Sequence, residues 1–240
     1  MDRSIERCLE DQKMFEKLWK MISGTEGLID QAQQESIEML ILGKEMFILA
    51  IDALQHKTTQ KLMRSLASMD KNMNKMEMEV RKKVFSHLAI SRGQDLLIGL
   101  QLNVIITDLE RIGDYTKNIG ELVEMLPGRL DFGRFDKTFN RVKNLALELF
   151  DLTYKALEER DEKIAGEVIR KYDEVSKIVD NCIKKVVAGK ELNETVEKRH
   201  VGLVLLLRYI KRVSAHLKNI ATSLVNPFHQ IGYRPGAYKP

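Results

Sequence analysis

Apolar residues recur at steps of three and four along almost the whole 240-residue chain, which is the pattern of amphipathic α-helices. In one such segment the apolar stripe runs from Ile37 through Leu40 and Phe47 to Leu54. The period predicts an all-α fold. The expected helices, separated by short polar or glycine-containing breaks, cover residues 2–22, 30–56, 59–86, 94–126, 136–159, 161–188 and 193–225.

The clearest break is the stretch PGRLDFGRF, whose proline and two glycines end the fourth expected helix. We therefore predict four parts of the chain. They are an N-terminal amphipathic helix and linker over 1–27, a three-helix unit over 28–127, a second three-helix unit over 128–226 and an irregular tail over 227–240.

The two three-helix units resemble each other in sequence. MFILAIDAL at 46–54 aligns with LFDLTYKAL at 149–157, and this alignment pairs Phe47 with Phe150. LERIGDYTKNI at 109–119 aligns with IKRVSAHLKNI at 210–220. The chain is therefore predicted to form two similar three-helix bundles in tandem, preceded by an extra N-terminal helix, and the short connections favour antiparallel neighbours.

Composition and charge exclude several classes of function. With 44% apolar, 31% charged and only 6% aromatic residues, the chain suits a helical protein rather than an all-β one. The net charge of +4 is spread among alternating acids and bases, so we predict no nucleic-acid partner. The start MDRSIERCLED is too acidic for a signal peptide and apolar runs such as VGLVLLL are short, so a cytoplasmic protein without direct membrane insertion is expected.

The candidate chemistry begins with two acids on the fourth expected helix. In DLERIGDYTKNIG, Glu110 and Asp114 are four residues apart, so they share one face of the helix and repel each other. Carboxylates crowded into a low dielectric take up protons or bind a cation. On a solvated face they would instead pair with Arg111 or with lysines, and both interpretations stay open here.

A second line of polar residues, Asp70, Asn74 and Glu77, follows one face of the third expected helix. If the two lines face each other, three carboxylates and one amide oxygen meet. Such oxygen ligands suit magnesium, manganese or iron. The candidate metal ligands are Asp70, Asn74, Glu110 and Asp114, with Glu77 as a candidate extra ligand.

The second unit departs from this pattern of acids. Lys211 and Ala215 stand where the first unit has Glu110 and Asp114, and Lys177 stands at the position of Asn74. Asp173 is the acid that remains. We therefore predict that the second bundle keeps the fold without the metal site, and that Lys177 or Lys211 pairs with Asp173.

Duplicated three-helix units that end in a helix of the form LERIGD-x-x-x-NI resemble the PhoU family of phosphate-transport regulators, over about residues 30–225. A companion motif of that family, D-x-x-V-D-x-L-E-x-E-I, corresponds to DKNMNKMEMEV at 70–80, where Asn74 replaces an aspartate. The resemblance implies bound metal ions (iron, manganese, magnesium or zinc), here in the first unit only. It also implies a cytosolic regulator of phosphate transport and signalling, with a phosphate transporter or an associated sensor kinase as its partner and a peripheral location at the inner membrane through the transporter.

A carboxylate-bridged metalloenzyme or metal-storage protein is the alternative function. EKRH at 197–200 is a single E-x-x-H, whereas a di-iron bundle needs two together with further glutamates. The sequence also lacks a glycine-rich phosphate loop and a G-x-S-x-G motif. We therefore predict a regulatory protein with no catalytic residues and no organic cofactor.

The two ends of the chain suggest contacts outside the duplicated core. The N-terminal helix carries an apolar stripe and Trp19, and the tail carries Phe228, Tyr233 and Tyr238. We predict a homodimer or partner contact through one or both ends, with packing of the N-terminal stripe on its own bundle as the alternative. The methionines of the third expected helix are expected to fill the core. They are Met73, Met76 and Met78.

Overall fold

The structure, a computed structural model, describes residues 27–55, 60–91, 93, 95–126, 131–188 and 198–236. The helix expected over 2–22 lies outside these residues. The described helices are α2 (Leu28–Gln55), α3 (Gln60–Ile90), α4 (Leu96–Met125), α5 (Asp136–Glu159), α6 (Glu162–Ala188) and α7 (Lys198–Val225), with short 3-10 turns at Gly133–Phe135 and Phe228–Gln230. No strand occurs in the described part of the chain, so the all-α prediction is confirmed.

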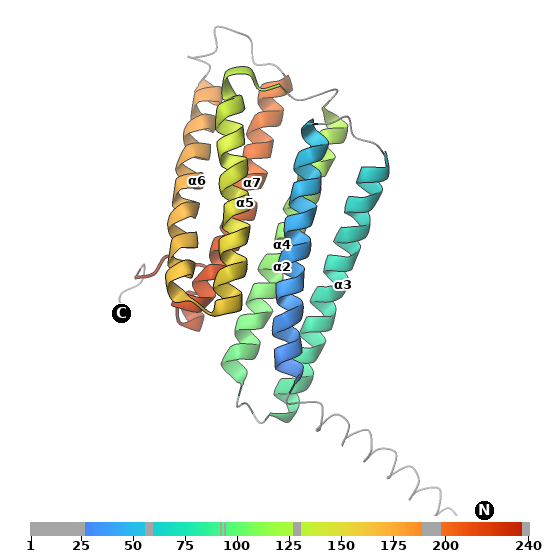
Figure 1. Cartoon of the computed structure of the whole chain (residues 1–240), viewed down its shortest axis with the longest axis vertical. Helices are drawn as coiled ribbons and strands as arrows, with labels where there is room; N and C mark the ends of the chain where they lie inside the picture. Colours follow the sequence, from blue (N-terminus) through green and yellow to red (C-terminus); the bar gives the residue numbers. More distant parts are fainter. Residues whose placement is uncertain are drawn as a thin grey trace, which may run out of the picture.

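The helices form two three-helix bundles that lie side by side (Figure 1). Helices α2, α3 and α4 make the first, and α5, α6 and α7 make the second, as the sequence repeat predicts. The bundles join where α4 packs along α7 and α2 meets α5, whereas α3 and α6 lie at opposite outer edges (Figure 1). None of the described helices combines the length and the apolar character needed to cross a membrane.

Equivalent residues of the two repeats contact each other at the junction. The rings of Phe47 and Phe150 are 5.6 Å apart between their centroids, and both residues are fully buried. On the neighbouring pair of helices, Tyr115 of α4 stacks on His216 of α7 at 5.6 Å. The same alignment that revealed the repeat pairs these two residues, so the repeats meet through matching faces.

The C-terminal tail folds back onto α7. Asn226 Nδ2 donates hydrogen bonds to the carbonyls of Gln230 and Tyr233 at 2.8 and 2.9 Å. The backbone N–H of Gly232, at φ +88°, donates to Thr222 Oγ1 at 2.7 Å. A side chain would be strained at that φ, which is why glycine suits the turn. The tail is irregular, as predicted, and its residues up to 236 have a defined place on their own bundle.

The methionines of α3 do not all serve the core. Met73 is fully buried and Met76 packs partly against the core, as expected. Met78 is 62% exposed, so its predicted core role is wrong. The reason is rotational, because Met78 lies on the outer side of a helix that packs only along its inner side.

Candidate functional site

Polar residues line the seam where α3 packs along α4. The buried side chains of Leu66, Met73 and Val80 fix the inner face of α3. This rotation places Asp70 and Glu77 beside α4, where each side chain is mostly buried. The polar line of α3 therefore faces α4 at Asp70 and Glu77, as the sequence predicted.

Cationic side chains engage both of these acids of α3, one from α4 and one from α3 itself. Lys117 Nζ of α4 donates to Asp70 Oδ2 at 3.3 Å. Arg81 lies 2.8 Å from Glu77 Oε1 and also donates to Thr107 Oγ1 of α4 at 3.2 Å. The bond with Asp70 and burial act on Lys117 in opposite directions, and the bond prevails, so the pKa of Lys117 is raised.

Glu110 and Asp114 form the most acidic part of the seam. Burial raises the pKa of Glu110, and the nearby charges of Asp114 and Glu77 raise it further. Arg111 opposes this shift, because its guanidinium lies 3.0 Å from Asp114 and 3.5 Å from Glu110. Glu110 therefore keeps its proton to a higher pH than an ordinary glutamate.

The structure brings some of the candidate metal ligands together. Glu77, Glu110 and Asp114 are electrostatic neighbours, whereas Asp70 is bound to Lys117 and Asn74 is exposed. Among the described residues, no group of three or more His, Cys, Asp or Glu side chains is arranged to hold a metal ion. The contacts of Arg111 are those expected of a solvated face. The metal assignment stays a prediction.

We expect Glu110→Gln to stabilise the metal-free protein at neutral pH. Because the folded pKa of Glu110 is raised, folding binds the proton more tightly, and stability is lost as pH rises above the ordinary glutamate pKa. Removing one like charge at this spacing is worth about 0.2–0.5 kcal/mol. Urea unfolding in the presence of chelator between pH 4 and 8 measures this gain in unfolding free energy. The control is Glu124→Gln, because Glu124 is an exposed acid of the same helix. A variant less stable than wild type at pH 7 would contradict the prediction.

The second repeat places a lysine at the corresponding point of its own seam. Lys211 Nζ of α7 contacts both carboxylate oxygens of Asp180 of α6 at 2.7 Å. In the repeat alignment Asp180 and Lys211 correspond to Glu77 and Glu110. The acid–acid neighbours of the first repeat are thus an acid–base pair in the second.

The predicted partner of Asp173 is wrong. Asp173 binds Arg234 of the tail at 2.5 Å, while Lys177 is exposed. Helices α6 and α7 run antiparallel, so their register sets Lys211 beside Asp180, about two turns along α6 from Asp173.

Lys211→Ala is accordingly expected to cost about 1 kcal/mol or less, because Asp180 is 45% exposed and water can solvate it. Chemical denaturation of both proteins at neutral pH measures the loss. A loss of several kcal/mol would show that Asp180 depends on the ammonium as a buried acid does.

A buried polar cluster between the repeats was not foreseen from the sequence. Asp108 Oδ1 of α4 lies 2.6 Å from His216 Nδ1 and accepts a hydrogen bond from Asn219 Nδ2 at 3.1 Å. Burial lowers the pKa of the nearby Lys218, although Asp108 and Asp173 oppose that shift. Asn219 thus donates a hydrogen bond from the second repeat to the first. The available signal was the i, i+3 spacing of His216 and Asn219 on one helix face.

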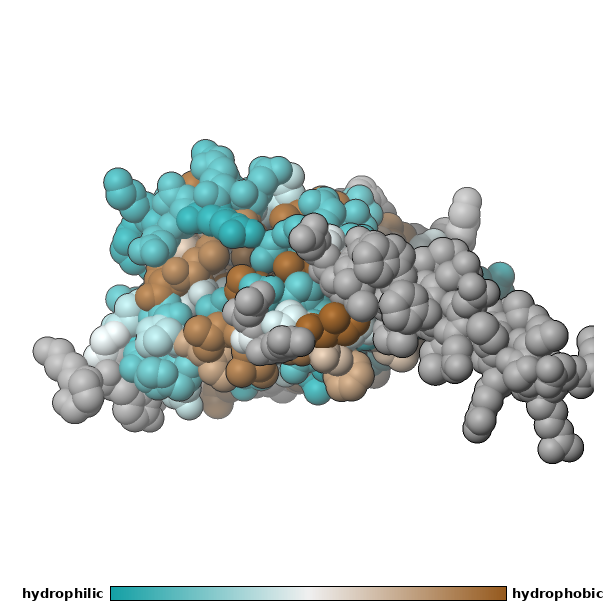
Figure 2. All heavy atoms as spheres, turned by 90° about the horizontal axis from the view of Figure 1, so that it is seen from below, coloured by the Kyte–Doolittle hydropathy of each residue, from teal (hydrophilic) through white to brown (hydrophobic). Residues whose placement is uncertain are grey.

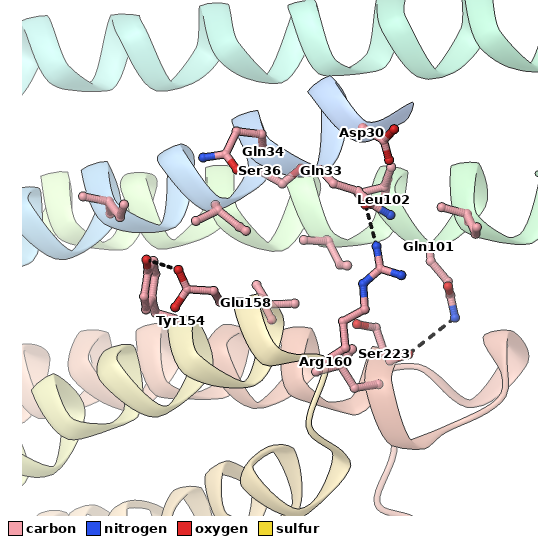
Figure 3. Close-up of a pocket in the computed structure, with 16 residues that line it drawn as sticks. Asp30, Gln33, Gln34, Ser36, Gln101, Leu102, Tyr154, Glu158, Arg160 and Ser223 are labelled. Atoms are coloured by element: carbon pink, nitrogen blue, oxygen red, sulfur yellow. Dashed lines mark hydrogen bonds between the residues drawn. The ribbon is translucent and has the colours of Figure 1, made fainter. Parts of the chain in front are cut away.

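A groove of about 440 Å³ lies between the repeats at the end where α2 and α4 begin (Figure 3). Its wall is mainly apolar, including Ile37, Leu102 and Leu157. Arg160 bridges it by donating to Gln33 Oε1 of α2 at 2.8 Å. None of the candidate metal ligands lines this groove, so it is separate from the acidic seam.

Comparison with known proteins identifies the fold and the family. Curated relatives include the phosphate-specific transport system accessory protein PhoU homolog of Synechocystis sp., 24% identical over 82% of this chain and 87% of the relative. PhoU homolog 1 of Thermotoga maritima is 27% identical over 78% of this chain and 82% of the relative. Solved structures with this fold include PhoU from Streptococcus pneumoniae and from Pseudomonas aeruginosa. Their TM-scores are 0.74 and 0.75, at 17% and 18% identity, over 84% and 83% of this chain and 95% and 96% of theirs.

The family model described as the PhoU domain matches the sequence twice. The matches cover residues 37–123 and 139–224, so one falls on each three-helix bundle. Both repeats are therefore recognised, including the second, which has Lys211 and Ala215 in place of Glu110 and Asp114. The chain belongs to the PhoU family.

Proposed function

We propose that this protein is a cytoplasmic accessory regulator of phosphate transport, which acts by contact with a phosphate transporter or its sensor kinase. The double match to the PhoU domain supports the proposal, together with relatives that are named accessory proteins of phosphate-specific transport systems. The role is regulatory rather than catalytic. The homodimer predicted from the chain ends belongs to the same proposal.

Deletion of the gene tests the regulatory role. Phosphate uptake should stay high in deleted cells grown with excess phosphate. Expression of the wild-type protein in these cells should lower uptake again when phosphate is in excess. Uptake that responds to phosphate equally with and without the gene would contradict the role.

The finer part of the proposal is a cation on the acidic seam of the first repeat. Glu77, Glu110 and Asp114 offer only oxygen donors, which suit a hard divalent or ferric ion such as magnesium, manganese or iron, and zinc is also accepted by carboxylates. The second repeat supports this assignment, because it supplies the Lys211 ammonium at the corresponding point. Arg111 is 55% exposed and is free to swing toward solvent when an ion binds. Asp70 would join only after release by Lys117, and Asn74 would complete the set.

Elemental analysis of protein purified without chelator tests the cation. Wild type should carry metal, and Glu110→Ala/Asp114→Ala should lose it. Asp52→Ala/Glu124→Ala removes two exposed acids of the same bundle and is the matched control. Equal metal content in all three proteins would contradict the assignment. Repeating the uptake measurement with Glu110→Ala/Asp114→Ala separates a failure of the metal site from a failure of the regulatory role.

The alternative of a carboxylate-bridged metalloenzyme or metal store gains no support from the described residues. Glu197 of the E-x-x-H lies outside them. His200 is buried and packs edge-on against Phe135, which is a core contact.

A further inference from the structure

The outer face of α3 carries a long row of basic residues without an acid among them. Residues seven apart on a helix lie about 20° apart in rotation, so they form a row along it. One row is Arg64, Lys71, Met78 and Phe85, and the adjacent row is Ser68, Lys75, Lys82 and Ala89. All of these residues are exposed. We call them the outer face of α3.

The cations of this face have no partners among the described residues. Other cations of the first bundle do, since Lys83 pairs with Glu35, Arg81 with Glu77 and Lys117 with Asp70. In contrast, no ion pair engages the side chains of Arg64, Lys71, Lys75 and Lys82 within the described ranges. Four positive charges without an ion-pair partner therefore project from one side of one helix, and the exposed acid Glu79 borders this side.

Two large apolar side chains interrupt the basic row. Met78 is 62% exposed and Phe85 is 75% exposed, although both residue types are usually buried. Near the end of α3, Leu96 and Leu97 at the start of α4 are exposed as well. Figure 2 views the molecule from the end where α3 ends and α4 begins, and it shows apolar residues among hydrophilic ones there.

The corresponding helix of the second repeat differs on its outer face. In the alignment that pairs Asp70 with Asp173, the row of Arg64, Lys71, Met78 and Phe85 corresponds to Glu167, Glu174, Asn181 and Ala188. Acids thus alternate with bases on α6, and Glu174 is paired with Arg141. The combination of unpaired cations with large apolar side chains belongs to α3, which lies at an outer edge of the molecule (Figure 1).

We propose that the outer face of α3 binds the surface of an anionic lipid bilayer. Lysine stems can lie along the interface while their ammonium groups stay among the lipid phosphates, and Phe85 and Met78 enter the boundary of the acyl chains. A helical protein partner fits less well, because lysines at the seam positions of a helix pair would be buried at a cost in stability. Lysine also lacks the rigid fork with which arginine recognises carboxylates at fixed positions.

Vesicle binding by the full-length protein tests the proposal. The wild type should sediment with phosphatidylcholine vesicles that contain phosphatidylglycerol, should not sediment with phosphatidylcholine alone, and should be released by salt. Lys71→Glu/Lys75→Glu/Lys82→Glu should weaken partitioning at least about 100-fold, since each lysine near an anionic surface contributes about fivefold. Phe85→Ala should also weaken the partitioning of the protein onto these vesicles, while leaving the need for anionic lipid unchanged.

The matched control reverses three exposed lysines on the outer face of α6, as Lys163→Glu/Lys177→Glu/Lys184→Glu. This control should bind almost as well as wild type, with circular dichroism confirming that both triple variants are folded. Equal losses in the two triple variants would show attraction to net charge and overturn the assignment to α3. Failure of the wild type to bind the anionic vesicles would also overturn the proposal. Binding of an acidic helical peptide by the protein in that case would point to a protein partner for this face. Vesicle binding does not depend on the regulatory role, so either can fail alone.

Discussion

Replacing Asp108 with alanine is expected to cost about 3–5 kcal/mol of unfolding free energy, because Asp108 is the buried acceptor shared by two residues of the other repeat. The substitution leaves His216 Nδ1 and Asn219 Nδ2 without this carboxylate. It also removes a charge that favours the ammonium of the partly buried Lys218. Urea denaturation at neutral pH measures the loss.

Two further variants define what the carboxylate of Asp108 contributes. Asp108→Asn keeps an acceptor oxygen, so it should recover part of the loss. Asp180→Ala removes a carboxylate that is also paired but half-exposed, and it should cost about 1 kcal/mol or less. If the Asp108 and Asp180 variants are equally stable, the contact between repeats is no stronger than a surface pair.

The second large effect is expected for Phe150→Ala, at about 3–5 kcal/mol. Phe150 is fully buried against Phe47, so the substitution opens a cavity where the two bundles meet. Phe85→Ala is the control of the same chemistry, because Phe85 is mostly exposed and should change stability by less than about 0.5 kcal/mol. Thermal and urea unfolding compare the three proteins.

A single transition that moves to lower denaturant in Phe150→Ala is the expected form of the result. If that variant instead unfolds in two separate transitions at the original midpoints, the bundles are independent and the ring contact does not join them.

Much of the fold could be predicted because apolar periodicity reports which side of each helix is buried. Phe47 and Phe150 stood at matching places in the two stripes, and both are core residues. Met78 shows the limit, since its residue type suggested burial whereas its rotation on α3 places it outside. Periodicity averaged over a helix is therefore a better guide than the type of one residue.

The candidate site was only partly predictable, because a sequence gives the face of a helix without its register against a neighbour. Glu110 and Asp114 were found from their spacing within one helix. The pairing of Lys211 with Asp180 depends on how far α7 slides along α6, and no local pattern reports that distance. Asp108 and His216 are far apart in sequence, and their contact follows from the packing of one repeat on the other.

The contact between equivalent residues at the junction has a consequence for how the chain could have arisen. In a symmetric dimer a residue at the two-fold axis touches its own copy, and every contact between two different residues is made twice. Tyr115 on His216 and Phe47 on Phe150 fit two identical subunits whose genes became fused. Once the two halves are fused, they can diverge in sequence, so a substitution at the junction changes one repeat and leaves the equivalent residue of the other unchanged. Asp108 illustrates that freedom, because its counterpart in the alignment is Tyr209, which makes a ring contact with Tyr115 in place of a second carboxylate–histidine pair.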